Sequence, residues 1–156
     1  MNTELIILPK VGLKTSTGTP FDKLVFGTPI DDVVAILGQA DDKESYHQED
    51  ELFTTMLVYE LYEIALFFEE IDKSTPKLGD IEIENENTIL YDTKIFGMNK
   101  EDFIRLMMAN GHSDSDYSID YDGELGEECI SFEDVSMDFY FFDNKLVSVN
   151  YTVPFI

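Results

Sequence analysis

The sequence predicts an α+β fold, and three observations support this class. Hydrophobic residues make up 44% and aromatic residues 13% of the 156 residues, which is enough to build a packed core. Two amphipathic helix patterns occur about 70 residues apart. Alternating apolar and polar residues, typical of antiparallel strands, follow each helix pattern. The chain length suits one domain or two closely packed half-domains.

The two helix patterns belong to two similar stretches of sequence. LVFGTPIDDVVAILGQADD starts at Leu24, and KIFGMNKEDFIRLMMANGHSD starts at Lys94. When their Phe-Gly dipeptides are superimposed, acidic and apolar positions coincide along both helices. A period of about 70 residues is longer than solenoid repeats and indicates a duplicated half-domain. We therefore expect one compact unit with an N-terminal segment (1–20), a first repeat (21–90) and a second repeat (91–156).

The first predicted helix follows Thr28, which is expected to cap it, and has Pro29 at its first position. Asp31 occupies the place where a capping box requires an acid. Gly38 is expected to end the helix. Three apolar residues form its core-facing stripe: Val33, Val34 and Leu37.

The second predicted helix is capped by Asn99, with Asp102 as the acid at the third position. Asn110 and Gly111 are expected to end it. Three apolar residues form its stripe: Phe103, Ile104 and Met107. Both stripes are interpreted as core faces, since this spacing is typical of helices packed on a sheet.

Each predicted helix is followed by three strands that form a short antiparallel meander. The strands are expected at 52–59, 64–70 and 78–85 in the first repeat, and at 128–135, 138–144 and 145–153 in the second. In the third strand, Ile81 and Ile83 share one face. Four residues of the last strand are expected to point inward: Val147, Val149, Tyr151 and Val153. Two such units can share one curved sheet, with both helices on one face.

The pattern of aromatic residues does not decide which face of these strands is buried. Phe139 and Phe141 are expected in the core of the second repeat. Matching Phe67 to Phe141 by the repeat places Phe67 in the core as well, although Glu69 shares its face. The two repeats therefore disagree, which a bulge would explain. The alternative is a sheet with aromatic residues on both faces, one of which awaits a partner.

The Phe-Gly dipeptide, followed by an acidic pair, an apolar helix and aromatic strands, resembles a known arrangement. It is similar to the tandem helix-and-meander repeats of β-lactamase-inhibitor-like proteins, and to the single copy in small outer-membrane-assembly lipoprotein domains of the SmpA/OmlA type. The resemblance covers about Phe21 to Val153. It implies a curved sheet whose helix-free face grips another protein. Secreted inhibitors carry disulfides and the lipoproteins a leader, so one cysteine and no leader favour a cytoplasmic binding protein.

The formal net charge of −23 limits the partners. A surface this acidic repels phosphate backbones, so nucleic acid and anionic membrane are not expected to bind. A basic protein is the expected partner, and a homodimer through an unpaired aromatic face is the alternative. The first residues contain neither a cationic region nor a long apolar run, which predicts a cytoplasmic protein without a signal peptide or membrane span.

The sequence contains no catalytic constellation, and we expect neither enzymatic activity nor a cofactor. Cys129 lies in an apparent strand, where a small packed residue is expected. His47 and His112 lie in polar segments that are typical of solvated loops. Gly-rich phosphate-binding motifs are absent from the sequence.

The strongest candidate for a binding site is the acidic segment SDSDYSIDYDGELGEE at 113–128. A second acidic run, 41–51, follows the first helix in the same way. Both are interpreted as loops that could flank one binding surface and clamp a basic protein, with tyrosines as anchors. The residues expected to contact the partner are Asp114, Asp116, Tyr117, Asp120, Tyr121, Asp122, Glu124, Tyr140 and Phe142.

The favoured function is a bacterial immunity or inhibitor protein that neutralises a basic toxin or enzyme. One alternative is a structural or assembly module, or a homodimeric domain, without such a target. The other is a calcium-stabilised domain. With Gly123 at the turn of an EF-hand loop, Ser118, Asp120 and Asp122 take the first ligand positions, but the bidentate acid position falls on Cys129.

Overall fold

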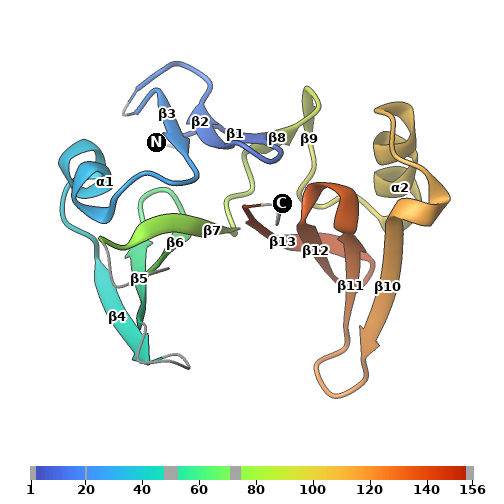
Figure 1. Cartoon of the computed structure of the whole chain (residues 1–156). Helices are drawn as coiled ribbons and strands as arrows, with labels where there is room; N and C mark the ends of the chain where they lie inside the picture. Colours follow the sequence, from blue (N-terminus) through green and yellow to red (C-terminus); the bar gives the residue numbers. More distant parts are fainter. Residues whose placement is uncertain (1–2, 20, 48–52, 71–74, 154–156) are drawn as a thin grey trace.

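The computed structural model describes residues 3–19, 21–47, 53–70 and 75–153. In these ranges the chain forms an α+β architecture with two α-helices and two mostly antiparallel sheets (Figure 1). The fold class predicted from the sequence is therefore confirmed. Within the described ranges no helix is both long and apolar enough to cross a lipid bilayer.

The larger sheet is built from two antiparallel meanders. Its strands are β4 (Asp42–His47), β5 (Phe53–Tyr59), β6 (Ile64–Glu69), β7 (Lys77–Ile83), β10 (Tyr117–Asp122), β11 (Glu127–Phe132), β12 (Met137–Phe142) and β13 (Lys145–Thr152). Their order is β10-β11-β12-β13-β7-β6-β5-β4. The meanders meet in the middle, where β7 pairs with β13 in antiparallel fashion. The edges of the sheet are β4 and β10.

A smaller sheet, which the sequence did not predict, combines the N-terminal segment with the middle of the chain. Its strands are β1 (Leu5–Leu8), β2 (Gly12–Thr15), β3 (Lys23–Val25), β8 (Thr88–Leu90) and β9 (Thr93–Lys94). Parallel pairing of β1 with β8 joins the two parts. At Gly12 a Cβ atom would clash with the carbonyl oxygen of Leu24 on β3, so this close strand approach requires glycine.

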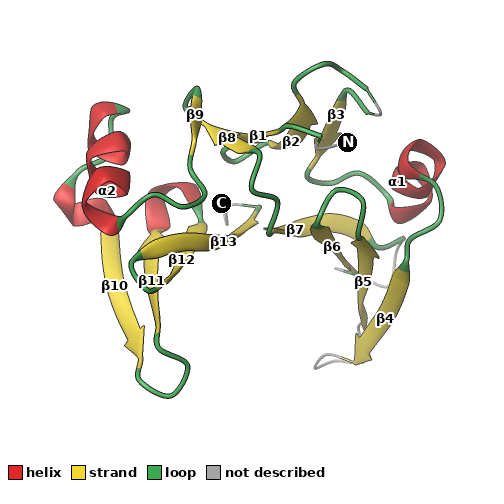
Figure 2. Cartoon of the chain, turned by 180° about the vertical axis from the view of Figure 1, so that it is seen from behind, coloured by secondary structure: helices red, strands yellow, loops and turns green. Residues whose placement is uncertain are grey.

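The larger sheet is drawn as an arch whose opening lies away from the helices (Figure 1). Helices α1 (Ile30–Leu37) and α2 (Lys100–Ala109) and the smaller sheet lie on the same, closed side of it. Figure 2 shows this arrangement from behind. We call the opposite side the helix-free face.

The hydrophobic core lies between the larger sheet and the elements that cover its closed side. From the sheet it receives alternate strand residues, among them Leu66, Phe68, Phe139 and Phe141, each at most 1% exposed. Tyr151 connects the two sheets, because its buried hydroxyl donates a hydrogen bond of 2.7 Å to the Gly12 carbonyl. The alternation of apolar residues along these strands places one side of every strand in this core.

The second helix begins as predicted. The Asn99 side chain accepts a hydrogen bond of 2.8 Å from the Asp102 N–H, and the C-cap is Asn110. The predicted cap of the first helix is wrong. Pro29 is the N-cap residue, and the Thr28 hydroxyl donates to the Val25 carbonyl, which turns it away from the helix.

The acidic segments contain strands and are not simply loops, which corrects the sequence interpretation. Strand β4 takes nearly all of the described part of the first segment, and the second contains a short 3-10 helix, strand β10, a turn and the start of β11. Both strands lie at edges of the sheet, and neither carries a buried residue among those whose side chains are described. Residues 48–51 of the first run lie outside the described part of the chain.

The open question about the aromatic strands is settled by the strand registers. Phe68 and Phe141 are both buried, and Phe67 is only partly buried. The pairing shifts between Phe67 and Phe68 in one meander, and between Tyr140 and Phe141 in the other. The placement of Phe67 in the core is therefore wrong. Phe68 and Phe141 each follow the register shift of their meander, and both point into the same core.

The inward positions predicted for the last strand are half right. Val149 and Tyr151 are buried, but Val147 and Val153 are each 41% exposed. Leu146 is buried instead. The irregular pairing at Tyr140 and Phe141 changes the alternation of the partner strand, so the residues before Val149 do not follow the simple period of two.

Candidate functional site

The helix-free face is formed by the alternate residues of the larger sheet that point away from the core. Directly opposed residues of antiparallel strands lie on the same face, so the strand registers assign its members. Acids are the largest group of charged members, and they outnumber the lysines on this face, Lys77 and Lys145. The carboxylates on this face are Asp42, Glu44, Glu69, Asp80, Glu82, Asp120, Asp122, Glu127 and Asp138.

Apolar and aromatic side chains lie between these acids. They are Tyr46, Met56, Val58, Phe67, Tyr140 and Phe142. Tyr46 is 42% and Phe142 is 53% exposed. The Tyr46 hydroxyl donates to the Glu44 carboxylate at 2.8 Å. The face therefore combines negative charge with aromatic surface that is open to solvent.

Asp80 lies near the middle of the face, where the two meanders meet. The Asn150 amide on β13 donates a hydrogen bond of 2.9 Å to its carboxylate. The pKa of Asp80 is raised to about 7, mainly by burial, against the lowering effect of the Asn150 hydrogen bond and with smaller raising contributions from the nearby acids Glu69, Glu82 and Asp138. Ionising Asp80 in the isolated protein therefore costs more free energy than ionising an exposed aspartate.

The neighbours of Asp80 share its environment. Burial, and then repulsion from Glu84, raises the pKa of Glu82. Burial is also the main reason why the pKa of Tyr140 rises to about 12. Burial raises the pKa of the Cys129 thiol, against the lowering effect of its contact with Ser131. The thiol is therefore protonated at neutral pH and is a poor nucleophile.

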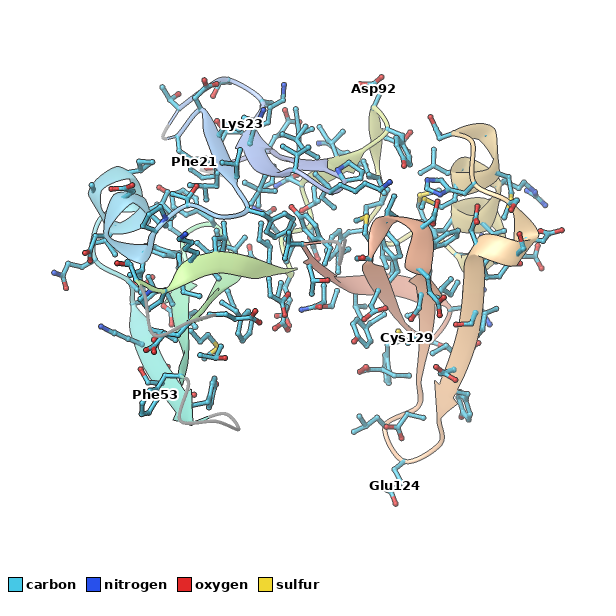
Figure 3. All side chains as sticks on the ribbon, viewed as in Figure 1. Phe21, Lys23, Phe53, Asp92, Glu124 and Cys129 are labelled. Carbon is cyan, nitrogen blue, oxygen red and sulfur yellow. The ribbon has the colours of Figure 1, made fainter. Side chains whose placement is uncertain are left out.

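Two shallow depressions mark this face. One, of about 410 Å³, lies over the centre of the sheet and is lined by Glu82, Glu84, Glu127, Tyr140, Val147, Ser148 and Asn150. The other, of about 610 Å³, lies beside the β10–β11 hairpin, with Tyr140 and Cys129 in its wall. Figure 3 shows Cys129 within this part of the sheet and Glu124 at the tip of the hairpin. Open depressions of this kind suit a protein surface better than a small molecule.

The central carboxylates have no cationic partner among the described side chains. The ion pairs formed by the described lysine and arginine residues lie elsewhere: Lys94 with Glu4, Lys100 with Glu128, and Arg105 with Asp102. Lys100 and Glu128 join α2 to β11 on the opposite side of the sheet. The negative charge of the helix-free face is consequently not balanced within the described part of the chain.

The structure brings together only part of the predicted partner-binding set. Asp120, Asp122, Tyr140 and Phe142 lie on the helix-free face. Tyr121 alternates to the other side of β10 and is 69% exposed. The remaining members are placed differently: Tyr117 packs against Phe132 with ring centroids 5.2 Å apart, Asp114 and Asp116 belong to a short 3-10 helix (Asp114–Asp116), and Glu124 lies in the hairpin turn.

Sequence reasoning missed the centre of the face. Asp80, Glu82 and Asp138 were not among its candidates, and neither was Asn150. The signal was present in the alternation of Ile81 and Ile83 with acids, but it was interpreted only as a strand with a solvent-facing side. A sheet centre is half-buried even on its open side, and this makes its acids different from those of the edges.

Two further expectations need correction. His112 is not a solvated loop residue, since only 8% of it is exposed. The EF-hand register fails because Ser118, Asp120 and Asp122 lie on strand β10, and the Asp122 carboxylate accepts the N–H groups of the following turn. His47 is the last residue of β4, and its side chain lies outside the described residues.

Comparison with known proteins gives one distant structural similarity. No family model matches the chain, and no curated protein matches it. The fold is similar to part of the crystal structure of an extracellular protein containing a SCP domain from Bacillus anthracis str. Ames, with a TM-score of 0.44 and 15% sequence identity. The similarity covers 81% of this chain and 43% of that protein.

Proposed function

We propose that the protein is a non-catalytic binding protein whose helix-free face takes a basic surface of another protein. The observation that supports this proposal is the group of half-buried, unpaired carboxylates at the centre of the face. They lie beside the exposed aromatic side chains that protein interfaces favour. In biological terms, we propose an immunity or inhibitor protein for a cationic toxin or enzyme.

Charge is the main argument for a basic partner. Asp80 and Glu82 already bear much of the desolvation cost that an interface would impose, and they lack the opposite charge that offsets it. A lysine or arginine brought by the partner supplies that charge. The acidic hairpins β4–β5 and β10–β11 stand at opposite edges of the same face. Their field accelerates the approach of a basic protein and makes the association rate sensitive to salt.

We further propose that the two meanders are tandem repeats, as the resemblance to β-lactamase-inhibitor-like proteins implies. Equivalent backbone hydrogen bonds support this proposal. Gly27 N–H donates to the Leu78 carbonyl at 2.8 Å, and Gly97 N–H donates to the Leu146 carbonyl at 3.0 Å. Both glycines have positive φ, 92° and 87°, which ordinary residues rarely adopt.

The strand registers are also consistent with an internal two-fold relation. The β7–β13 pairing opposes Ile83 to Val149, Ile81 to Tyr151, and Glu82 to Asn150. If Leu78 is matched to Leu146, each residue of β7 has its equivalent 68 positions later on β13. Exchanging the two halves then converts the Ile83–Val149 pair into the Ile81–Tyr151 pair and leaves the Glu82–Asn150 pair unchanged. The proposed axis therefore passes through the Glu82–Asn150 pair, in the middle of the helix-free face. A partner bound there would meet similar backbone with different side chains on its two sides.

The experiment that tests the proposed function is a pull-down with charge-matched variants. The face variant carries Glu44→Lys and Asp120→Lys, two exposed acids near opposite edges of the helix-free face. The control carries Asp22→Lys and Glu86→Lys, two exposed acids outside the larger sheet. Lysates of the source cell are applied at low salt, and captured proteins are eluted with a salt step and identified by mass spectrometry.

The proposal expects a basic protein that wild type and control retain and that the face variant loses. The purified partner should then bind with a rate constant that falls steeply as salt is added. Equal loss of the captured protein in both variants would show that the interaction depends on overall charge and not on the helix-free face. Capture of nothing, with a dimer of the chain itself in solution, would favour a structural module and contradict the proposal.

A further inference from the structure

His112 is the centre of a polar cluster on the closed side of the sheet, and this cluster is independent of the proposed binding face. The ring is 8% exposed, and its Nδ1 atom lies 2.7 Å from Oδ2 of Asp134. On the other side, its Nε2 atom lies 2.7 Å from the Tyr91 hydroxyl. Phe132 packs edge-on against the ring, with centroids 5.4 Å apart. The orientation of the imidazole is therefore determined by contacts on three sides.

Asp116 completes this cluster. One ligand atom each from His112, Asp116 and Asp134 fits within a separation of 4.8 Å. The Asp116 carboxylate is held by the Ser113 N–H at 2.7 Å and by the Ser113 hydroxyl at 3.2 Å. Both bonds use the same oxygen, Oδ2. The three groups come from three places in the chain: the end of α2, the following 3-10 helix, and the 3-10 helix at Glu133–Val135.

We propose that His112, Asp116 and Asp134 bind a divalent transition-metal ion of the zinc class, through Nδ1 of the histidine and one oxygen of each carboxylate. Zinc with one nitrogen and two oxygen ligands at its usual bond lengths of about 2.0–2.2 Å separates ligand atoms by roughly 3.4 Å. The observed separation is close enough for small side-chain rotations to reach this arrangement. Water supplies the fourth ligand.

Tyr91 is not one of the proposed ligands, but its hydroxyl contacts the Nε2 atom of His112 and so helps to orient the ring. In the tautomer with its proton on Nδ1, the ring donates to the Asp134 carboxylate and its Nε2 accepts from the Tyr91 hydroxyl. Metal binding uses the Nδ1 lone pair and therefore requires the other tautomer, in which the Nε2–H donates to the Tyr91 oxygen. A metal-bound histidine usually donates its second N–H to such a partner. The tyrosine hydroxyl serves in both states because it donates and accepts.

The donor set selects the kind of ion. An imidazole nitrogen with two carboxylates suits zinc and its transition-metal neighbours, whereas calcium and magnesium prefer oxygen ligands only. The bound ion would link the β8–β9 turn, through Tyr91, to the segments around α2 and β11. Asp92, which follows Tyr91, is labelled at this turn in Figure 3. The expected role is structural, because His112 and Tyr91 are both at least partly buried.

Calorimetric titration with zinc chloride tests the site, and the test must separate it from the diffuse attraction of a chain with a net charge of −23. The buffer contains physiological potassium chloride and an excess of magnesium, which compete with zinc for the non-specific sites. We expect one zinc ion per chain. Asp116→Asn should weaken binding about tenfold or more, a loss typical for changes at metal ligands and their supports. Asp114→Asn removes the same charge two residues away and should leave the affinity unchanged.

Nitrogen NMR of the wild-type side chains provides a readout that does not depend on a variant folding correctly. The sequence has two histidines, so His47 is an internal reference. One equivalent of zinc should shift the Nδ1 resonance of His112 and fix the proton on its Nε2, without the same change at His47. Equal weakening by the two variants, or a response of both histidines in parallel, would overturn the site and leave only diffuse cation binding.

Discussion

The two halves of the larger sheet are both antiparallel meanders of four strands, but they anchor their helices in different ways. In the second half, α2 buries Phe103 and Met107, and the Phe103 ring lies 4.4 Å from Phe139 and 5.6 Å from Phe141 between centroids. In the first half, Val33 is the fully buried residue of α1. An aromatic cluster therefore anchors α2 to the sheet, whereas smaller aliphatic contacts anchor α1.

The regions behind the helices differ in polarity as well. In the first half, the Tyr59 hydroxyl donates to the Gly38 carbonyl at the end of α1, at 2.9 Å. The proposed repeat matches Tyr59 to Phe132 of the second half, which has no hydroxyl and packs on His112. The comparison teaches that positions matched by the proposed repeat make different polar contacts.

The largest expected difference between the halves concerns their helix anchors. Phe103→Ala should reduce the free energy of unfolding by about 3–5 kcal/mol, because it empties the aromatic cluster under α2. Val33→Ala removes much less buried surface and should cost about 1–2 kcal/mol. Urea denaturation followed by circular dichroism measures both. Equal losses would show that the two helices depend on their anchors to the same degree.

The next comparison exchanges the residues at one position of the two halves. Asp134→Leu should cost about 1–3 kcal/mol, because a buried nitrogen of His112 loses its hydrogen-bond partner. Leu61, which the proposed repeat matches to Asp134, is 68% exposed. Leu61→Asp should therefore change stability by no more than about 0.5 kcal/mol. A cost of Leu61→Asp as large as that of Asp134→Leu would contradict the correspondence.

A third difference is the titration of Asp80, which the proposed repeat matches to Ser148 of the second half. Its folded pKa, about 7, exceeds the ordinary 3.8, so the folded state holds the proton more tightly. Stability is then lost between pH 4 and 7 as the carboxylate ionises. Asp80→Asn should stabilise the protein by on the order of 1–2 kcal/mol above pH 7, and hardly at all near pH 4. Thermal melts across this range measure the effect, and a pH-independent difference would count against it.

The smallest effect concerns the helix starts. Asn99→Ala removes a side chain that caps α2 and should cost about 1 kcal/mol. Thr28→Ala at the start of α1 should cost less, about 0.5 kcal/mol, because its hydroxyl binds the Val25 carbonyl rather than the helix N–H groups. Chemical denaturation of the two variants side by side decides the order. A larger loss of stability for Thr28→Ala than for Asn99→Ala would support Thr28 as the helix cap, as predicted from the sequence.

The sequence predicted the elements with strong apolar periodicity. The α+β class, the second helix with its Asn99 cap and the inward face of Ile81 and Ile83 are confirmed. Strand β10 was missed although Tyr117, Ile119 and Tyr121 alternate with polar residues, because its acidic residues led the segment to be interpreted as a loop. The smaller sheet was missed because its strands are short, and its β1–β8 pairing joins residues more than 80 positions apart, such as Leu5 and Thr88.

The candidate face could be predicted only in part. Asp120, Asp122, Tyr140 and Phe142 were found because acidic and aromatic residues concentrate there. Asp80 escaped because its importance depends on burial at a junction of strands from both halves, and no local pattern shows which strand pairs with β7. The His112 cluster escaped for a similar reason: Asp134 lies 22 positions from it in the chain.

The open edges of the larger sheet have a consequence for self-association. Strands β4 and β10 each leave one row of backbone groups unpaired within the described sheet, and such rows recruit strands from other molecules. Asp42 and Glu44 on one edge, and Asp120 and Asp122 on the other, place like charges against any identical strand that approaches. Repulsion therefore keeps neutral solutions free of edge-to-edge fibres. Near the isoelectric point of about 4.1 this protection fails, and growth through the two edges becomes possible.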